Sequence, residues 1–146
     1  MKSEEEILNE LIKRLSGQGG LWFSQVPLGL KRYADVPPKY VADLIRVEAP
    51  SFEVYPRLDV KYWRRAMSGD PIYKDLNFNG KHVLIIEGKS VADYGCIGQV
   101  LVYKEAFKED WPMAQTIELG IAANSFDAWV KETCDRLGIK TWIIDP

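Results

Sequence analysis

Cysteine and histidine are scarce in this sequence, which has two cysteines, Cys96 and Cys134, and one histidine, His82. Each cysteine falls in a segment with the pattern of a helix, so we expect two reduced core thiols rather than a disulfide or a metal site. His82 stands just before a predicted strand, where a turn-flanking role is expected rather than that of a catalytic base. Reduced thiols are typical of intracellular proteins, so we expect a cytoplasmic location.

Long apolar runs are also missing, because no stretch approaches the length of a membrane span. The first ten residues are acidic and amphipathic, which is the wrong chemistry for a signal peptide. No internal repeat and no low-complexity segment is present. These absences argue against a membrane partner and favour an ordinary globular protein, with 47% hydrophobic and 27% charged residues.

A strong positive charge is absent as well, since the formal net charge is −2. A protein that neutralises phosphates usually has a basic face, so this balance does not by itself favour nucleic-acid binding. Acidic metal ligands lower the net charge, however, while attracting the cations that meet phosphate. Basic residues also concentrate locally, at Lys31 and Arg32 and in the segment 61–65.

The 146 residues are predicted to form a single domain, 1–146, folded as a three-layer α/β/α sandwich around a central mixed sheet. The segment 49–80 is expected to be an insertion that holds a short helix near 60–67 and ends at the turn Asn79-Gly80. Alternating helices and strands in the second half predict parallel pairing there. The hydrophobic pattern predicts helices over 3–16, 91–109 and 125–138, the last capped by Ser125, and strands over 21–30, 41–48, 81–88, 115–123 and 140–144.

Charged residues stand at the end of the clearest predicted strand. The segment 83–86 is wholly apolar, as in a strand buried on both faces, and Glu87 and Lys89 follow it. Residues two apart on a strand face the same way, so this carboxylate and this ammonium group are expected side by side. Asp43 lies on the strand predicted beside them. Two converging carboxylates repel each other unless a cation joins them, and oxygen ligands suit Mg²⁺ or Mn²⁺.

These residues, with a later Gln and Tyr four apart, resemble the motifs of a known nuclease family. Asp43, the tripeptide Glu87-x-Lys89 and the spacing Gln99-x-x-x-Tyr103 are similar to those of the PD-(D/E)XK nuclease superfamily. The last element looks like the QxxxY motif of its RecB-like branch, as in archaeal and viral nucleases. The resemblance covers nearly the whole chain in element order and implies a restriction-endonuclease-like fold.

The resemblance also implies a mechanism and roles for individual residues. Asp43, Glu87 and the Gly88 carbonyl would hold Mg²⁺, for which Mn²⁺ would substitute. This metal would polarise the phosphodiester and activate a water. Lys89 would position that water or stabilise the developing negative charge, and Gln99 would be aimed at the same site.

The first metal ligand and a third carboxylate stay open at this point. Asp75 is the alternative to Asp43, and the length of the loop at Asn79-Gly80 decides which face of the sheet it takes. Asp59 is a further rival. Glu4 falls on the inward face of the first helix, where it is either an additional metal ligand or a partner of the helix dipole.

Contacts to nucleic acid stay open as well. Tyr103 either contacts nucleic acid or packs in the core. Arg64 and Arg65 follow two aromatic residues, Tyr62 and Trp63. Cations beside aromatic surfaces grip phosphate and stack on unpaired bases, and the alternative is a surface helix with Trp63 packed inward.

The function that the resemblance implies is a metal-dependent deoxyribonuclease that acts in DNA repair, recombination or replication. A structure-selective, junction-resolving endonuclease is one alternative, which the acidic charge balance does not favour. A non-catalytic nucleic-acid-binding or assembly module with the same fold is another, which the intact set of Asp, Glu, Lys and Gln does not favour. The small size suggests a homo-oligomer or a subunit of a larger repair or replication complex. RNA as a substrate and the choice between endonuclease and exonuclease stay open.

Overall fold

The computed structural model describes residues 2–33 and 37–146. Its strands are β1 (Gly20–Leu28), β2 (Tyr40–Val47), β3 (Phe52–Tyr55), β4 (His82–Ala92), β5 (Thr116–Phe126) and β6 (Lys140–Ile143). Its helices are α1 (Glu4–Leu15), α2 (Val60–Met67), α3 (Tyr94–Asp110) and α4 (Ala128–Leu137), with short 3₁₀ helices η1 (Ser16–Gln18) and η2 (Pro71–Leu76). Within these residues, no helix has the length and apolar character needed to cross a membrane.

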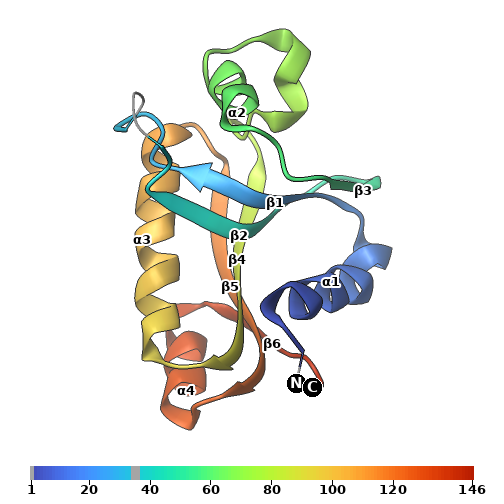
Figure 1. The fold of residues 1–146 in the computed structure, drawn as a ribbon, viewed down its shortest axis with the longest axis vertical. Helices are drawn as coiled ribbons and strands as arrows, with labels where there is room; N and C mark the ends of the chain where they lie inside the picture. Colours follow the sequence, from blue (N-terminus) through green and yellow to red (C-terminus); the bar gives the residue numbers. More distant parts are fainter. Residues whose placement is uncertain (1, 34–36) are drawn as a thin grey trace.

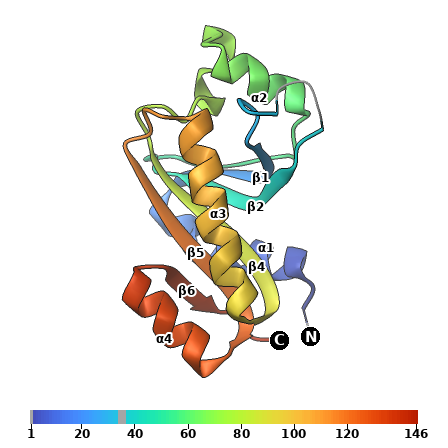
Figure 2. The ribbon, with the colours of Figure 1, turned by 90° about the vertical axis from the view of Figure 1, so that its left-hand side faces the viewer.

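One mixed sheet of six strands, in the order β3-β1-β2-β4-β5-β6, forms the centre of the fold. Strands β1, β2 and β4 pair antiparallel, whereas β4, β5 and β6 pair parallel through the crossover helices α3 and α4. The parallel pairing predicted for the second half is confirmed. Helix α1 lies on one face of the sheet and α3 runs along the other (Figures 1 and 2).

Helix α1 begins with a capping box between Ser3 and Glu6. The Ser3 hydroxyl accepts from the Glu6 N–H at 3.2 Å, and the Glu6 carboxylate accepts from the Ser3 N–H at 3.1 Å. Its apolar stripe is buried against the sheet in a cluster that includes Ile7, Leu11 and Ile86. These contacts confirm the helix predicted over 3–16.

The opposite face of the sheet carries the larger core, to which α2, α3 and α4 contribute. Val100 and Phe107 of α3 are fully buried there, together with Cys96 of α3 and Cys134 of α4. Both thiols are free and buried, as predicted. Helix α1 forms one layer, the sheet forms the second, and the helices on the opposite face form the third, which are the three layers that the sequence predicted.

The segment 49–80 contributes a strand to the sheet, which the sequence did not predict. Strand β3 pairs parallel with β1 at the edge of the sheet. Its Phe52 and Val54 are 44% and 47% exposed, so no buried face gave it a recognisable pattern. Helix α2 spans the predicted residues, and its Trp63 is buried against Phe23 and Phe78, with ring centroids 5.6 and 5.4 Å away.

The predicted boundaries between β4 and α3 and between β5 and α4 are wrong, because the two strands pair further along the chain than expected. Their ladder continues to Ala92 and Phe126, so Glu87 lies inside β4 rather than at its end. Helix α3 consequently starts after Asp93, whose side chain caps it. Helix α4 is capped by Asp127 rather than by Ser125, which belongs to β5.

Candidate active site

The two antiparallel strands β2 and β4 stop pairing beside Glu87. Backbone pairing between them ends at Leu44 and Ile86. One step further, the Asp43 Oδ2 accepts a hydrogen bond from the Gly88 N–H at 3.0 Å. A side chain thus replaces the backbone partner, and the Asp43 carboxylate is placed across from Glu87 where the ladder ends.

Glu87 is buried at this point, with only 2% of its surface exposed. Burial and the neighbouring charge of Asp43 raise the pKa of Glu87 from 4.5 to about 9. Its Oε1 has no hydrogen-bond partner among the described residues. Because an unpaired buried carboxylate oxygen is costly, Glu87 requires either a proton or a cation in this position.

Lys89 follows on the same strand and is partly buried. Burial lowers its pKa, but the charges of Glu4, Glu87, Cys96 and Asp43 outweigh burial and raise the pKa. Carboxylates from α1, β2 and β4 therefore act on one ammonium group. The structure brings Asp43, Glu87 and Lys89 together, as the sequence predicted that it would.

Helix α1 approaches β4 closely at Gly88. A Cβ added to Gly88 would lie 2.9 Å from the Leu8 Cγ, so a larger residue would push the helix away from the strand. This approach carries Glu4, in the first turn of α1, to the wall of the pocket that also contains Asp43. The role of Glu4 as a metal ligand stays a prediction.

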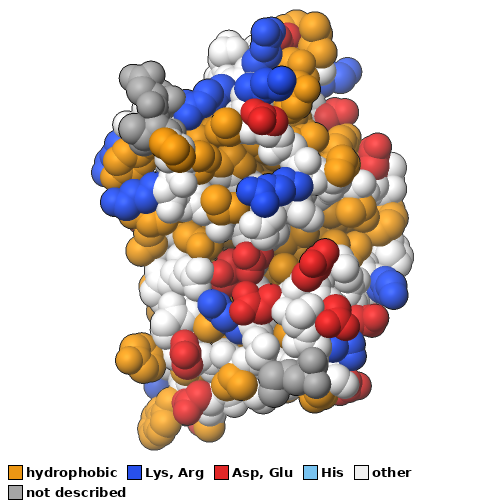
Figure 3. Space-filling model, viewed as in Figure 1, with side chains coloured by type: hydrophobic (Ala, Val, Ile, Leu, Met, Phe, Trp, Pro, Cys, Tyr) orange, Lys and Arg blue, Asp and Glu red, His pale blue; other side chains and the backbone are white. Residues whose placement is uncertain are grey.

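The pocket beside Asp43 has a volume of about 490 Å³. Its polar lining consists of Glu4, Glu5, Asn9, Ser24, Gln25, Asp43 and Arg57. Acidic side chains gather in the middle of the face drawn in Figure 3, with basic side chains above and below them.

Gln25, in the lining of this pocket, has an unusual backbone conformation. Among the described residues it is the only one other than glycine with a positive φ, of 52°. Strained backbone of this kind concentrates at functional sites.

Gln99 and Tyr103 of α3 contact each other, with the Gln99 Nε2 donating to the Tyr103 hydroxyl at 2.9 Å. Burial raises the pKa of Tyr103, the bond from Gln99 lowers it in part, and the charge of Glu87 raises it further, so this helix face adjoins the site. The Tyr103 ring is 8% exposed and packs edge-on against Tyr40, with centroids 6.4 Å apart. This placement favours core packing and positioning of Gln99 over direct contact with nucleic acid.

The donor set suits a hard divalent cation. Asp43 and Glu87 face each other, and one Glu87 oxygen is unpaired within the described residues. No group of three or more His, Cys, Asp or Glu side chains arranged for a metal is found over 2–33 and 37–146. A cation bound by two carboxylates would complete its shell with backbone oxygen, water and substrate, which Mg²⁺ commonly does.

The alternative carboxylates lie elsewhere. Asp75 is exposed on η2, so it is not on a strand and does not stand opposite Leu84, as a hairpin at Asn79-Gly80 would require. Asp59 caps α2 by accepting from the Lys61 N–H at 2.9 Å. The register therefore places Asp43, rather than either alternative, across from the site.

Arg64 and Arg65 lie on α2, at the top of Figure 1. Arg65 forms an ion pair with Asp70 at 3.5 Å. The residues that line the pocket around Asp43 include neither arginine. Trp63 is buried and cannot stack on a base, so the predicted role in binding nucleic acid stays a prediction for the partly buried Tyr62 and for the cations of this segment.

Sequence reasoning missed Arg57 and Gln25. Arg57 lies in an irregular stretch between β3 and α2, where no periodic pattern distinguishes it. Gln25 left a signal that could have been used. Phe23 and Val26 both belong to the larger core although they are three residues apart, so the alternation of β1 reverses at Gln25.

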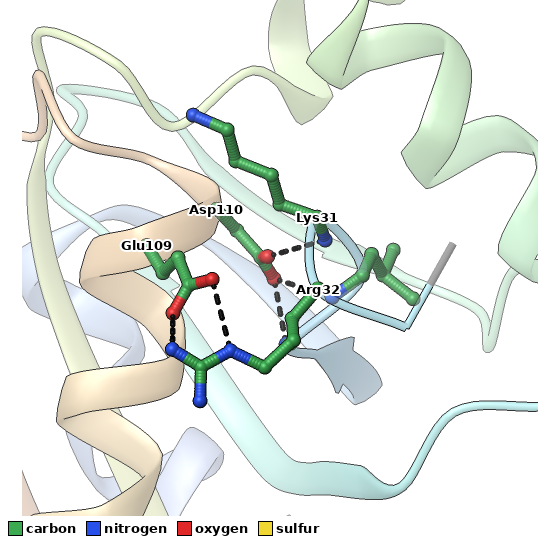
Figure 4. Close-up of polar contacts among 6 residues, drawn as sticks. Lys31, Arg32, Glu109 and Asp110 are labelled. Carbon is green, nitrogen blue, oxygen red and sulfur yellow. Dashed lines mark hydrogen bonds and ion pairs between the residues drawn. The ribbon is translucent and has the colours of Figure 1, made fainter.

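A second polar cluster, also missed, fastens the loop between β1 and β2 to the end of α3 (Figure 4). The buried Asp110 carboxylate accepts from the three backbone N–H groups of residues 29–31 at 2.8, 3.2 and 2.9 Å. Burial raises the pKa of Asp110, and these donors offset part of that effect. On the surface, Arg32 makes a two-point contact with Glu109. The loop held in this way leads into β2, which carries Asp43.

The raised pKa of Glu87 predicts that the metal-free protein loses stability as the pH rises. The folded state favours the protonated carboxyl, so this contribution is complete below about pH 4.5 and is lost as the pH approaches 9. We expect the melting temperature in EDTA to fall by about 5 °C or more between pH 5 and pH 9. Glu87→Gln, which cannot ionise, should flatten this slope; thermal melts of both proteins across the range measure it. Equal slopes would show that Glu87 does not titrate in this way.

Comparison with known proteins supports the fold. No family model matches the sequence, and no curated protein matches it significantly. The crystal structure of a repair endonuclease from Pyrococcus abyssi is similar, with a TM-score of 0.57 and 16% sequence identity. The match covers 100% of this chain and 48% of that one, so the chain spans about half the length of this neighbour. At this identity the likeness shows the fold alone. The chain therefore has a nuclease-like fold, the restriction-endonuclease-like α/β sandwich that the sequence predicted.

Proposed function

We propose that this chain is a divalent-metal-dependent deoxyribonuclease of the PD-(D/E)XK superfamily. The observation that carries the proposal is the facing pair of carboxylates, Asp43 and Glu87, with Lys89 on the same strand. Glu87 is buried with one oxygen unpaired within the described residues, which a cation would relieve. The nuclease-like fold adds to this support.

Asp43, Glu87 and the Gly88 carbonyl would hold Mg²⁺, with Mn²⁺ as a substitute and Glu4 as a further ligand. Their oxygens match the preference of hard cations. When bound, such a cation polarises the phosphodiester and lowers the pKa of an attacking water. Because Glu87 must release its proton to bind a cation, the affinity for metal should rise with pH.

Lys89 and Gln99 would act on the substrate. The charges of Glu4, Glu87 and Asp43 raise the pKa of Lys89 and keep it charged, so it can stabilise the negative charge that develops on the phosphate. The Tyr103 hydroxyl holds the Gln99 amide on the face of α3 that adjoins Glu87 and Lys89. Gln99 would orient the water or the phosphate, with Tyr103 as its positioning residue.

The substrate we propose is DNA undergoing repair, recombination or replication, cut by one nuclease domain. The similar repair endonuclease is about twice as long as this chain, which covers 48% of it. As its assembly we propose a homo-oligomer or a larger repair or replication complex. The free, buried Cys96 and Cys134 are consistent with a cytoplasmic location for this activity.

A cleavage screen tests the proposal. Labelled single-stranded, duplex and branched DNA, and RNA, are incubated with the protein in Mn²⁺, in Mg²⁺ and in EDTA. We expect DNA cleavage with either metal and none in EDTA. Asp43→Asn should lower both cleavage and the Mn²⁺ affinity measured by calorimetry, because one ligand is lost.

Asn9→Ala is the matched control, since Asn9 lines the same pocket and carries no charge. Its Mn²⁺ affinity should equal that of the wild type. A wild-type protein that binds nucleic acid but cuts none of these substrates would replace the nuclease proposal with a binding module.

A further inference from the structure

The segment 55–58, at the end of β3 and before α2, contributes residues to two pockets. Arg57 lines the pocket that contains Asp43. Tyr55 and Leu58, on either side of Arg57 in the chain, line a second pocket of about 360 Å³. One short stretch of chain therefore contributes side chains both to the pocket that contains Asp43 and to this second pocket.

The second pocket is aromatic. Tyr55, Tyr62 and Tyr73 contribute to it, and the rings of Tyr62 and Tyr73 are 5.6 Å apart and tilted by 46°. Ile72 stands at its rim with 80% of its surface exposed. Partly exposed aromatic rings beside a large exposed aliphatic side chain form a surface on which a flat, weakly polar group can stack. We call these residues the tyrosine pocket.

The pocket that Arg57 lines and the tyrosine pocket differ in their charged side chains. Arg57 is exposed, and within the described part of the chain no hydrogen bond or ion pair occupies its guanidinium group. Asp75 lies in the tyrosine pocket, where its carboxylate would repel phosphate. Among the described residues that line the pocket of Asp43, Arg57 is the one basic side chain, so a phosphate drawn to a cation on the carboxylates would meet Arg57 there. The tyrosine pocket has Asp75 and, among its described residues, no basic side chain, which leaves it to an uncharged ring.

Additional positive charge borders the same path. The Lys61 ammonium lies 5.1 Å from the centre of the Tyr62 ring. On the face drawn in Figure 3, basic side chains lie above the acidic group in the middle, towards the end of the molecule where Figure 1 shows α2. A nucleic-acid backbone that runs from Asp43 and Glu87 towards α2 would therefore pass basic side chains.

We propose that the tyrosine pocket binds an unpaired base of the substrate strand, while Arg57 holds a phosphate between that base and the bond that is cut. The proposal rests on the nuclease function, because it identifies the substrate as a strand that is single-stranded on this side of the cut. A paired base cannot enter, since its faces are covered by neighbouring bases and its edge by the partner strand. Stacking on tyrosine requires that the base leave the duplex.

Binding can be measured apart from cleavage. Fluorescence anisotropy in Ca²⁺ compares a labelled single strand with a fully paired, blunt-ended duplex of two strands, and a gel confirms that each probe stays intact. We expect the wild type to prefer the single strand. Tyr62→Leu, which keeps apolar bulk, should weaken that binding by about 5-fold or more through the loss of stacking. Ile72→Glu changes an exposed side chain and puts a negative charge at the rim, so it should weaken binding without disturbing the fold.

Arg57→Ala should weaken binding of the single strand and reduce the slope of log affinity against log salt by about 0.7, the value for one lost phosphate contact. Arg57→Lys should restore that slope. Arg136→Ala, an exposed arginine on α4, is the control and should change neither quantity. Thermal melts of each variant verify folding.

Equal wild-type affinity for the two probes, or unchanged affinity in both Tyr62→Leu and Ile72→Glu, would overturn the proposal. So would tyrosine-pocket variants that dissociate an oligomer while binding DNA as before, because the pocket would then receive a second copy of the chain. Failure of the nuclease function has a different signature. The wild type would cut nothing in Mn²⁺ while its preference for the single strand and the variant effects persisted.

Discussion

Replacing Lys89 with methionine is expected to lower the rate of DNA cleavage by ~10²-fold or more while changing DNA affinity little. The charges of Glu4, Glu87 and Asp43 raise the pKa of the Lys89 ammonium. Its charge would act mainly on the negative charge that develops at the phosphate in the transition state. Methionine keeps much of the apolar stem, so the fold should survive. Single-turnover cleavage in Mn²⁺ measures the rate, and anisotropy measures the affinity.

Lys108→Met is the matched control for this substitution. Lys108 lies on α3 with its side chain 54% exposed, and its ion pair with Glu105 is 3.6 Å long. Its loss should change neither cleavage nor melting. A Lys89→Met protein that cuts at the wild-type rate would end the proposed role. A lower melting temperature with full activity in the folded fraction would instead make Lys89 a structural partner of Glu87.

The centre of the site could be predicted from the sequence because it depends on strand periodicity. The apolar run 83–86 marks the buried strand, and Glu87 and Lys89 follow with the spacing that puts them on one face. The residues around Asp43 have the pattern of a neighbouring strand. Antiparallel pairing that ends at Leu44 and Ile86 then brings Asp43 across from Glu87. The pattern along each strand is local, whereas the pairing of β2 with β4 belongs to the fold, and for this reason the sequence left Asp75 open as an alternative to Asp43.

The positions where strands end could not be predicted, because they are set by pairing with other strands rather than by the local sequence. The predicted strand ended at Gly88, yet pairing with β5 carries β4 on to Ala92. The edge strand β3 buries neither Phe52 nor Val54, so its sequence had no periodic pattern to detect. The position of Arg57 follows from where β3 attaches to the sheet, and it could not be predicted once that strand was missed.

Asp110 was missed for a related reason, since its partners lie about 80 residues away in the chain. An acidic residue in the last turn of a helix is unfavourable for the helix dipole. Its burial there, with 5% of its surface exposed, is explained by the hydrogen bonds that it accepts from three backbone N–H groups. Neither the helix pattern nor the loop pattern contains that relation.

Asp110→Asn is expected to lower the free energy of unfolding by about 3 kcal/mol, because the N–H groups of residues 29–31 would lose a charged acceptor. Asparagine has nearly the same shape but only one accepting oxygen, and its amide would turn donors toward donors. For a chain of this size the melting temperature should fall by about 5–10 °C. Urea and thermal unfolding measure both quantities.

The neighbouring Glu109 provides the control, because it also joins α3 to the same loop but does so at the surface. Its ion pair with Arg32 spans 2.8 Å, with side chains 38% and 65% exposed. Exposed pairs contribute little, so Glu109→Gln should shift the melting temperature far less than Asp110→Asn. Equal shifts in the two variants would show that the buried bonds of Asp110 do not hold the loop. If they do hold it, Asp110→Asn should also weaken Mn²⁺ binding at a temperature where the protein is folded, because the loop leads into the strand that carries Asp43.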